Sequence, residues 1–290
     1  MDKNLPKNYS EGEMPKDDAY FIRHSKSNYK TSADTLKSED PRAAFDPEKQ
    51  ITPDLTEEGR ELAKNKAEEL FNGLDPAGDK LFFVSSNEVR ALETANIYRE
   101  VASARGFEII KPDKSGGALA EQIGSGEIRV VENLSLNPED TLLFHIFAPQ
   151  KLLRPINWGA VDEEFKKKWE RAREIIKSDD QGTYGANLHK YSAAIKEIFP
   201  QIETTREMHE RQFGNLLRLV KWAEKKFNIK DNKIRVIAFG HENYVLQGLE
   251  EYFQEHGIDN CETIGLSLSD DKINLSFREK TVELNAQTSK

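Results

Sequence analysis

The chain has 290 residues, of which 32% are charged and 37% are hydrophobic, and its formal net charge at pH 7 is -9. This composition is typical of a soluble globular protein that is long enough to bury a substantial core. The negative net charge argues against general binding to nucleic acid or to an anionic membrane, so any phosphate site has to be a local basic pocket.

The first 18 residues are polar and contain two prolines. They lack the apolar core of a signal peptide, so we expect a flexible N-terminal segment over residues 1–18. The apolar stretch 142–148 is interrupted by His145 and is too short to span a bilayer. Cys261 is the single cysteine, which excludes an internal disulfide and fits a reducing compartment. These features predict a cytoplasmic protein.

A short apolar run at residues 20–22 predicts a buried strand, and this run stops at Arg23 and His24. Polar residues follow as a loop. In open α/β sheets, ligands bind at the carboxyl ends of the strands, so an arginine and a histidine at such an end suit a site for an anion. The pair alone is weak support, because such neighbours are often a surface coincidence.

The next segments predict a loop, a helix and a second buried strand. Residues 31–53 contain three prolines and predict a long loop, which is either a binding segment or plain surface. Thr56 can cap a helix with two glutamates in its first turn, and the helix is expected to end near Gly73. Residues 81–84 are continuously apolar, as expected for a strand buried on both faces.

Another helix is expected after this strand, with Ser86 or Asn87 as its cap and Arg90 in its first turn. The helix dipole opposes a cation there, and such a local conflict is typical of a functional residue. A solvated helix arginine is the plain alternative. Residues 111–127 then predict a second loop, rich in glycine, serine and lysine.

The second half of the chain begins with mainly helical patterns over residues 138–227, whose apolar stripes indicate packing faces rather than a cofactor pocket. Residues 234–239 then predict a third buried strand, which ends at Gly240 and His241. A helix is expected from there to about His256. Two closing strands are expected at 264–268 and 273–277.

Four motifs occur in the order in which the histidine phosphatase superfamily, also called the phosphoglycerate-mutase-like family, carries them. They are Arg23-His24-Ser25, Leu55-Thr56-x-x-Gly59, Ser86-x-x-x-Arg90-Ala91-x-x-Thr94-Ala95 and Gly240-His241-Glu242. Each motif alone is weak, but four in this order, each in its expected strand or helix context, resemble the family strongly.

The resemblance implies an α/β fold, a three-layer α/β/α arrangement with a mainly parallel sheet of the phosphoglycerate-mutase-like type. It implies one domain over residues 19–283, with a helical insertion at about 138–227 near the active site. Residues 284–290 are expected to form a disordered tail.

The resemblance also implies residue roles. His24 would be the nucleophile that attacks phosphorus and forms a phosphohistidine. Arg23, Arg90 and His241 would hold the phosphoryl oxygens, and Ser27 would add a phosphate contact. His24 must present an unprotonated nitrogen, so its other N–H is expected to donate to a backbone carbonyl.

No cofactor and no metal is expected, because no metal-ligand spacing links the remaining histidines. We interpret these as structural or surface residues: His145, His189, His209 and His256.

The mechanism also needs a carboxyl group that protonates the leaving oxygen and later accepts a proton from water. Glu132, at the end of a short strand expected at 128–131, fits the position used in the mutase-like branch. Glu242, directly after the late histidine, fits the position used in the acid-phosphatase branch. Glu139 and Asp140 are further candidates, and we favour Glu132.

Two positions depart from the family pattern. Ser25 stands where the family usually has glycine, a modest change. Lys30 stands where the mutase-like branch has asparagine, six residues past the histidine, although Asn28 lies nearby. The second departure argues against mutase activity.

We therefore predict a phosphoryl-transfer enzyme, a metal-independent phosphomonoester hydrolase that works through a phosphohistidine on His24. The alternatives are a phosphoglycerate-mutase-type phosphotransferase and a catalytically weak module of the same fold that binds a phosphorylated ligand. The expected partner is a small phosphorylated substrate or a phosphoprotein, with no nucleic acid and no membrane. The long loops favour a substrate larger than free phosphoglycerate, and the sequence sets no oligomeric state.

Overall fold

The structure is a computed structural model, and it describes residues 7–8, 17–28, 55–86, 89–110, 141–143, 163–178, 184–200, 203–227, 232–269 and 272–285. The expected loops 31–53 and 111–127 lie outside these ranges. No helix in the described part of the chain combines the length and the hydropathy that crossing a membrane requires.

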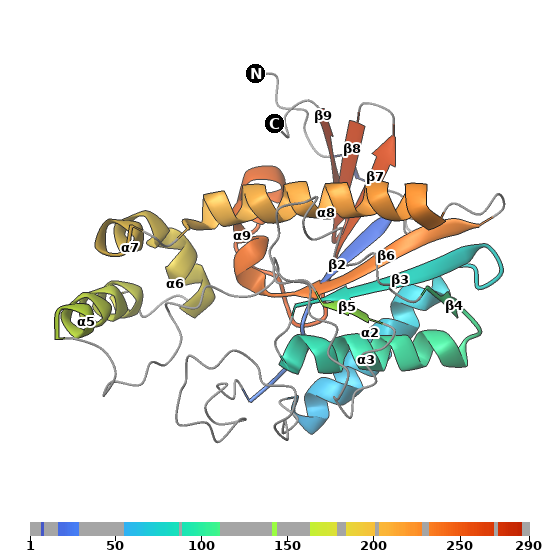
Figure 1. The fold of residues 1–290 in the computed structure, drawn as a ribbon, viewed down its shortest axis with the longest axis horizontal. Helices are drawn as coiled ribbons and strands as arrows, with labels where there is room; N and C mark the ends of the chain where they lie inside the picture. The colour runs from blue at the N-terminus through green and yellow to red at the C-terminus, as the bar shows by residue number, and fades with distance from the viewer. Residues whose placement is uncertain are drawn as a thin grey trace.

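The fold is built on one nine-stranded sheet (Figure 1). Its strands in order are β1 (Lys7–Asn8), β9 (Lys280–Asn285), β8 (Lys272–Phe277), β7 (Thr263–Ser269), β2 (Ala19–Arg23), β6 (Lys233–Gly240), β3 (Asp79–Ser85) and β4 (Glu108–Ile109), with β5 (Thr141–Leu143) also paired to β3. The sheet is mixed: β2, β6, β3, β4 and β5 pair in parallel, whereas β7, β8, β9 and β1 pair antiparallel. The α/β class expected from the sequence is confirmed.

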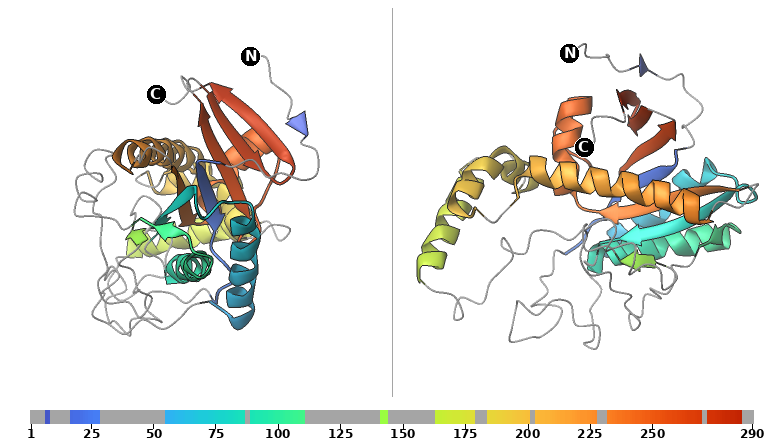
Figure 2. Two further views of the ribbon diagram at one scale, coloured as in Figure 1. Left: turned by 90° about the vertical axis from the view of Figure 1, so that its right-hand side faces the viewer. Right: turned by 45° about the horizontal axis from the view of Figure 1, so that its top comes forward.

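Alternate residues of the central strands pack on opposite faces of the sheet, as the pleat of a strand requires. Tyr20 and Ile22 of β2 pack with α2 (Glu57–Asn72) and α3 (Val89–Ala104). Phe21 between them packs with α8 (Thr205–Phe227). Figure 2 shows these helices on the two sides of the sheet, which gives the expected three layers.

Helix α2 begins as the sequence predicts. The hydroxyl of Thr56 accepts a hydrogen bond from the Gly59 amide at 3.0 Å, and the helix ends at Gly73. This cap satisfies one of the backbone donors that the first turn leaves without an intrahelical partner.

Three shorter helices lie within the expected helical stretch 138–227: α5 (Glu163–Lys177), α6 (Tyr184–Lys190) and α7 (Ser192–Ile198). They have an apolar core of their own, centred on Trp169, Ile195 and Phe199. Figure 1 places them at the side of the sheet where β2, β3 and β6 end.

The segment after β6 differs from the single helix that the sequence predicts up to His256. It forms a 3-10 turn, η5 (Glu242–Tyr244), a short α9 (Leu246–Gly248) and a π-helical turn, η6 (Leu249–Phe253). It stops at Gln254, whose φ of 58° is left-handed and incompatible with a continuing right-handed helix. The apolar spacing that predicted a helix does not distinguish these helix types.

Two terminal strands were not expected. β9 pairs with β8 and continues through Asn285, past the predicted end of the domain at residue 283. β1 pairs with β9 inside the segment 1–18 that was expected to be a flexible lead-in. β1 is only two polar residues long and is too short to show the alternation by which strands are recognised in a sequence. β9 does alternate, with Val282 and Leu284 packed against the core, so its pattern was missed.

Candidate active site

The carboxyl ends of β2, β6 and β3 bring the first and last motifs together. The strands are parallel neighbours with Arg23 opposite Gly240, so the residues that follow each strand leave the sheet at the same level. His24 and His241 are buried, and their ring centroids lie 5.0 Å apart at an angle of 62°. The two histidines therefore meet at the sheet edge where the sequence predicts a site.

The hydrogen bonds of His24 define its tautomer. Nδ1 lies 2.7 Å from the carbonyl oxygen of Ser25, which can only accept, so Nδ1 carries the proton. Nε2 then carries the ring's lone pair, and Arg90 Nε donates to it at 3.3 Å. The expected contact to a backbone carbonyl is present.

Burial is the largest cause that lowers the pKa of His24, to about 3, followed by the charge of Arg90, with a smaller contribution from Arg23. The hydrogen bond to the Ser25 carbonyl opposes this shift. The imidazole is therefore neutral at physiological pH, which is the state that a nitrogen nucleophile needs.

His241 is held from two sides. Its Nε2 lies 2.8 Å from the hydroxyl oxygen of Ser86, the residue that follows β3. Its ring makes an edge contact with Tyr244, with centroids 5.4 Å apart at 86°. The sequence named Ser86 as a possible helix cap and as the first residue of the third motif. It did not predict this contact, because the contact depends on the register between β3 and β6.

Arg23 contacts two residues that follow β6 in the sequence, Glu242 and Ile258. One terminal nitrogen of its guanidinium lies 3.3 Å from Glu242 Oε2, and the other donates to the carbonyl of Ile258. Its Nε is buried and has no partner among the described residues. Burial raises the pKa of Glu242, and the charge of Arg23 opposes that shift. Glu242 is therefore linked to the candidate site through its ion pair with Arg23.

The Leu-Thr-x-x-Gly motif explains how α2 supports the loop after β2. The Thr56 amide donates to the carbonyl oxygen of Lys26 at 3.1 Å, and Ser27 and Leu55 form an antiparallel bridge. A Cβ on Gly59 would lie 2.1 Å from the Lys26 oxygen, so only glycine allows this approach. The motif packs α2 tightly against the loop that carries His24.

The other predicted site residues have different outcomes. Ser27 is buried, and its hydroxyl has no hydrogen-bond partner among the described residues. Glu132 lies outside the described ranges, as do Glu139 and Asp140. No group of three or more histidine, cysteine, aspartate or glutamate side chains that could hold a metal ion occurs in the part of the chain that the structure describes.

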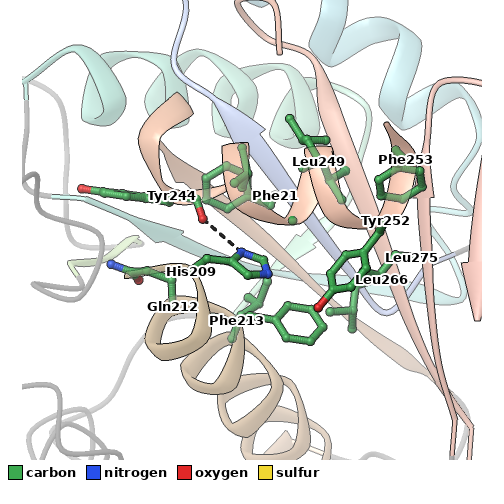
Figure 3. A pocket seen from close by; sticks show the side chains of 14 residues that line it. Phe21, His209, Gln212, Phe213, Tyr244, Leu249, Tyr252, Phe253, Leu266 and Leu275 are labelled. Carbon is green, nitrogen blue, oxygen red and sulfur yellow. Dashed lines mark hydrogen bonds between the residues drawn. The ribbon is translucent and has the colours of Figure 1, made fainter. Parts of the chain in front are cut away.

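A separate apolar pocket of about 50 Å³ lies between α8 and η6, on the face of the sheet that carries Phe21 (Figure 3). His209 lies in its wall and contacts the carbonyl of Tyr244 at 3.3 Å, and burial lowers its pKa. Of the histidines interpreted as structural, His209 packs against the core and His189 pairs with Glu250 at 2.9 Å.

The sequence matches no known protein-family model, and no curated protein matches it. Solved structures align with the chain over most of its length, but distantly. A phosphoglycerate mutase from Bacillus anthracis is 15% identical, with 92% of this chain and 91% of that chain covered and a TM-score of 0.41. A mycobacterial glucosyl-3-phosphoglycerate phosphatase is 14% identical, with 90% and 97% covered and a TM-score of 0.40.

A phosphoserine phosphatase from Entamoeba histolytica, a mutant in complex with phosphoserine, is 11% identical, with 89% of this chain and 95% of that chain covered and a TM-score of 0.37. Two of these three structures are phosphatases and one is a mutase, and each likeness is distant. The resemblance to the histidine phosphatase superfamily therefore rests on the four motifs of the sequence.

Proposed function

We propose that the protein is a metal-independent phosphomonoester hydrolase that works through a phosphohistidine on His24. One observation carries the proposal: a buried, neutral imidazole presents the lone pair of Nε2 to an arginine, with a second histidine beside it. Buried groups that are cationic or polar and face one another are well suited to a bound phosphoryl dianion.

In the proposed reaction, Nε2 of His24 attacks phosphorus, and the bond from phosphorus to the ester oxygen breaks. Arg90, whose Nε already lies at Nε2, donates to the phosphoryl oxygens together with Arg23 and His241. A water then attacks the phosphohistidine, which returns Nε2 with its lone pair and releases phosphate. Donors held in place before the reaction stabilise the charge that builds up on the transferring group.

The leaving oxygen needs a proton, and Glu132 stays our prediction for the acid. Glu242 is the alternative, since it lies at the site and burial raises its pKa. Replacing the acid by glutamine slows hydrolysis of an alkyl phosphate much more than that of p-nitrophenyl phosphate, whose leaving group needs little protonation. We expect this selective loss in Glu132→Gln, whereas the same loss in Glu242→Gln would move the role to Glu242.

The central test is turnover of p-nitrophenyl phosphate together with isolation of a phosphoenzyme. We expect the wild-type protein to release phosphate and to accumulate an acid-labile, base-stable phosphoenzyme that is absent in His24→Ala. Interconversion of phosphoglycerates without net phosphate release would favour a mutase instead. Binding of phosphate esters with neither turnover nor phosphoenzyme would leave only a binding module.

A further inference from the structure

Ser25 is held at three points directly beside the proposed nucleophile. Its N–H donates to Thr94 Oγ1 at 3.0 Å, and its carbonyl oxygen accepts from His24 Nδ1 at 2.7 Å. Its hydroxyl donates to the carbonyl oxygen of Gly59 at 2.6 Å. Ser25 is completely buried, so each of these bonds forms away from water.

Thr94 closes a loop of hydrogen bonds that begins and ends on the same imidazole. Its hydroxyl accepts from the Ser25 amide and donates to the carbonyl of Arg90 at 2.7 Å, one turn earlier on α3. The side chain of Arg90 in turn donates to His24 Nε2. The two ring nitrogens of His24 are thus tied to one another through Ser25, Thr94 and Arg90.

This loop fixes two properties that a histidine nucleophile needs. The carbonyl of Ser25 selects the Nδ1–H tautomer, which leaves the lone pair on Nε2. The bond between the Ser25 N–H and Thr94 holds the Ser25 backbone against the helix that carries Arg90, which limits where the adjoining carbonyl can point. A displacement of about 1 Å at such a point costs on the order of 10²-fold in rate.

We propose that Thr94 is a positioning residue that fixes the tautomer and the direction of the His24 imidazole through the Ser25 peptide. The expected effect on kcat rests on the proposed function, but the expected effect on the His24 tautomer does not. The tautomer of His24 is a property of the resting protein and can be measured without any substrate.

The test compares Thr94→Val, which keeps the shape and removes the hydroxyl, with Thr94→Ser, which keeps the hydroxyl. Thr205→Val is the matched control: Thr205 is also buried, and its hydroxyl lies 2.8 Å from His189 Nδ1 rather than near His24. The readouts are the ¹⁵N NMR signals of the His24 ring and the kcat and KM for p-nitrophenyl phosphate.

For Thr94→Val we expect kcat to fall about 10- to 100-fold with KM changed less than about threefold, the size of effect that one misplaced hydrogen bond gives. His24 should then populate both tautomers. Thr94→Ser and Thr205→Val should keep the Nδ1–H tautomer and a kcat within about threefold of the wild type.

The proposal is overturned if Thr94→Val keeps the wild-type tautomer, or if Thr94→Ser is impaired as severely as Thr94→Val, since the methyl group would then be the part that matters. If Thr94→Val does not fold, Thr94→Ala replaces it, and loss of the fold in both shows that the hydroxyl serves folding. A wild-type protein without turnover would refute the proposed hydrolase, while the NMR signals would still decide the role of Thr94.

Discussion

The two ends of the central strands carry buried ionisable side chains in opposite arrangements. At the carboxyl ends, His24, His241 and Arg90 lie close together. At the amino ends of the same strands, acids and bases alternate and pair. Asp79 begins β3, and Arg235 lies near the start of β6.

The amino-end network pairs acids with bases. Arg235 Nε donates to Asp79 Oδ1 at 2.8 Å, and another of its nitrogens donates to the carbonyl of Asp17 at 2.7 Å. Lys233 lies 2.6 Å from Asp18 Oδ1. Buried groups that pair in this way need no outside ligand, and they hold the register of strands that are distant in the sequence.

The contrast teaches which buried charges indicate a site. Opposite charges that neutralise one another are explained by the fold itself. A neutral histidine between an arginine and a second histidine is costly to assemble and is resolved by a bound anion. Changes at the carboxyl ends should therefore affect activity, and changes at the amino ends should affect stability.

The largest effect is expected for His24→Ala. Because the change removes the proposed nucleophile, turnover of p-nitrophenyl phosphate should fall about 10⁴-fold or more, as for other covalent nucleophiles. Thermal unfolding should change little in comparison, because the imidazole is not part of a charge pair that holds the fold. If His24→Ala lost its fold while its folded fraction still turned over substrate, His24 would serve stability rather than activity. The contrast between the two ends would then be reversed.

At the amino ends, Arg235→Met should destabilise the fold by about 3–5 kcal/mol, because it leaves buried carboxylates without their partner. The side chain is almost completely buried and bonds to Asp79. Denaturant unfolding measures the loss, and kcat of the folded fraction should stay within about threefold of the wild type. A full loss of activity with unchanged stability would count against a structural role for this network.

At the carboxyl ends again, Arg90→Gln should lower kcat by about 10²-fold, since it removes one preorganised donor to the phosphoryl group. It should also raise the pKa of His24, because the charge of Arg90 is one of the causes that lower it. An NMR titration of His24 checks the direction of the pKa change. A lowered or unchanged pKa would contradict the proximity of the two side chains.

The sequence predicted the strand ends of the site well, for a simple physical reason. Continuous apolar runs mark strands buried on both faces, and in β2 and β6 such a run stops at a charged or imidazole side chain, as at Arg23 and His241. The order of the motifs then indicated the α/β class. Local sequence patterns are sufficient to predict a feature, such as the end of a buried strand, that depends on residues adjacent in the sequence.

Contacts that depend on tertiary register could not be predicted. Arg235 meets Asp79 only because β6 lies beside β3 in one register. Arg23 meets Ile258 only because the irregular segment after β6 turns back at Gln254. The bond from Ser25 to Thr94 likewise joins residues 69 positions apart. No periodicity or motif spacing encodes these distances.

The smallest effect is expected for Asp17→Asn, and its size depends on pH. Burial is the largest cause that raises the pKa of Asp17, from 3.8 to about 6, and the negative charge of Asp18 adds to the rise. The hydrogen bond from Ser276 and the positive charges of Arg235 and Lys233 oppose the rise. A raised carboxyl pKa means that the folded state holds a proton that the unfolded state has lost, so the wild type loses stability as pH rises from about 4 to 6.

Asparagine carries no charge and can still accept from Ser276, so Asp17→Asn should be more stable than the wild type at pH 7, by on the order of 1–3 kcal/mol. Below pH 4 the carboxyl is protonated in both states, and the difference should nearly vanish. Unfolding by denaturant at pH 4 and pH 7 measures both values. A stability difference that is the same at the two pH values would mean that folding does not raise the pKa of Asp17, and that the partners of this carboxylate compensate for its burial.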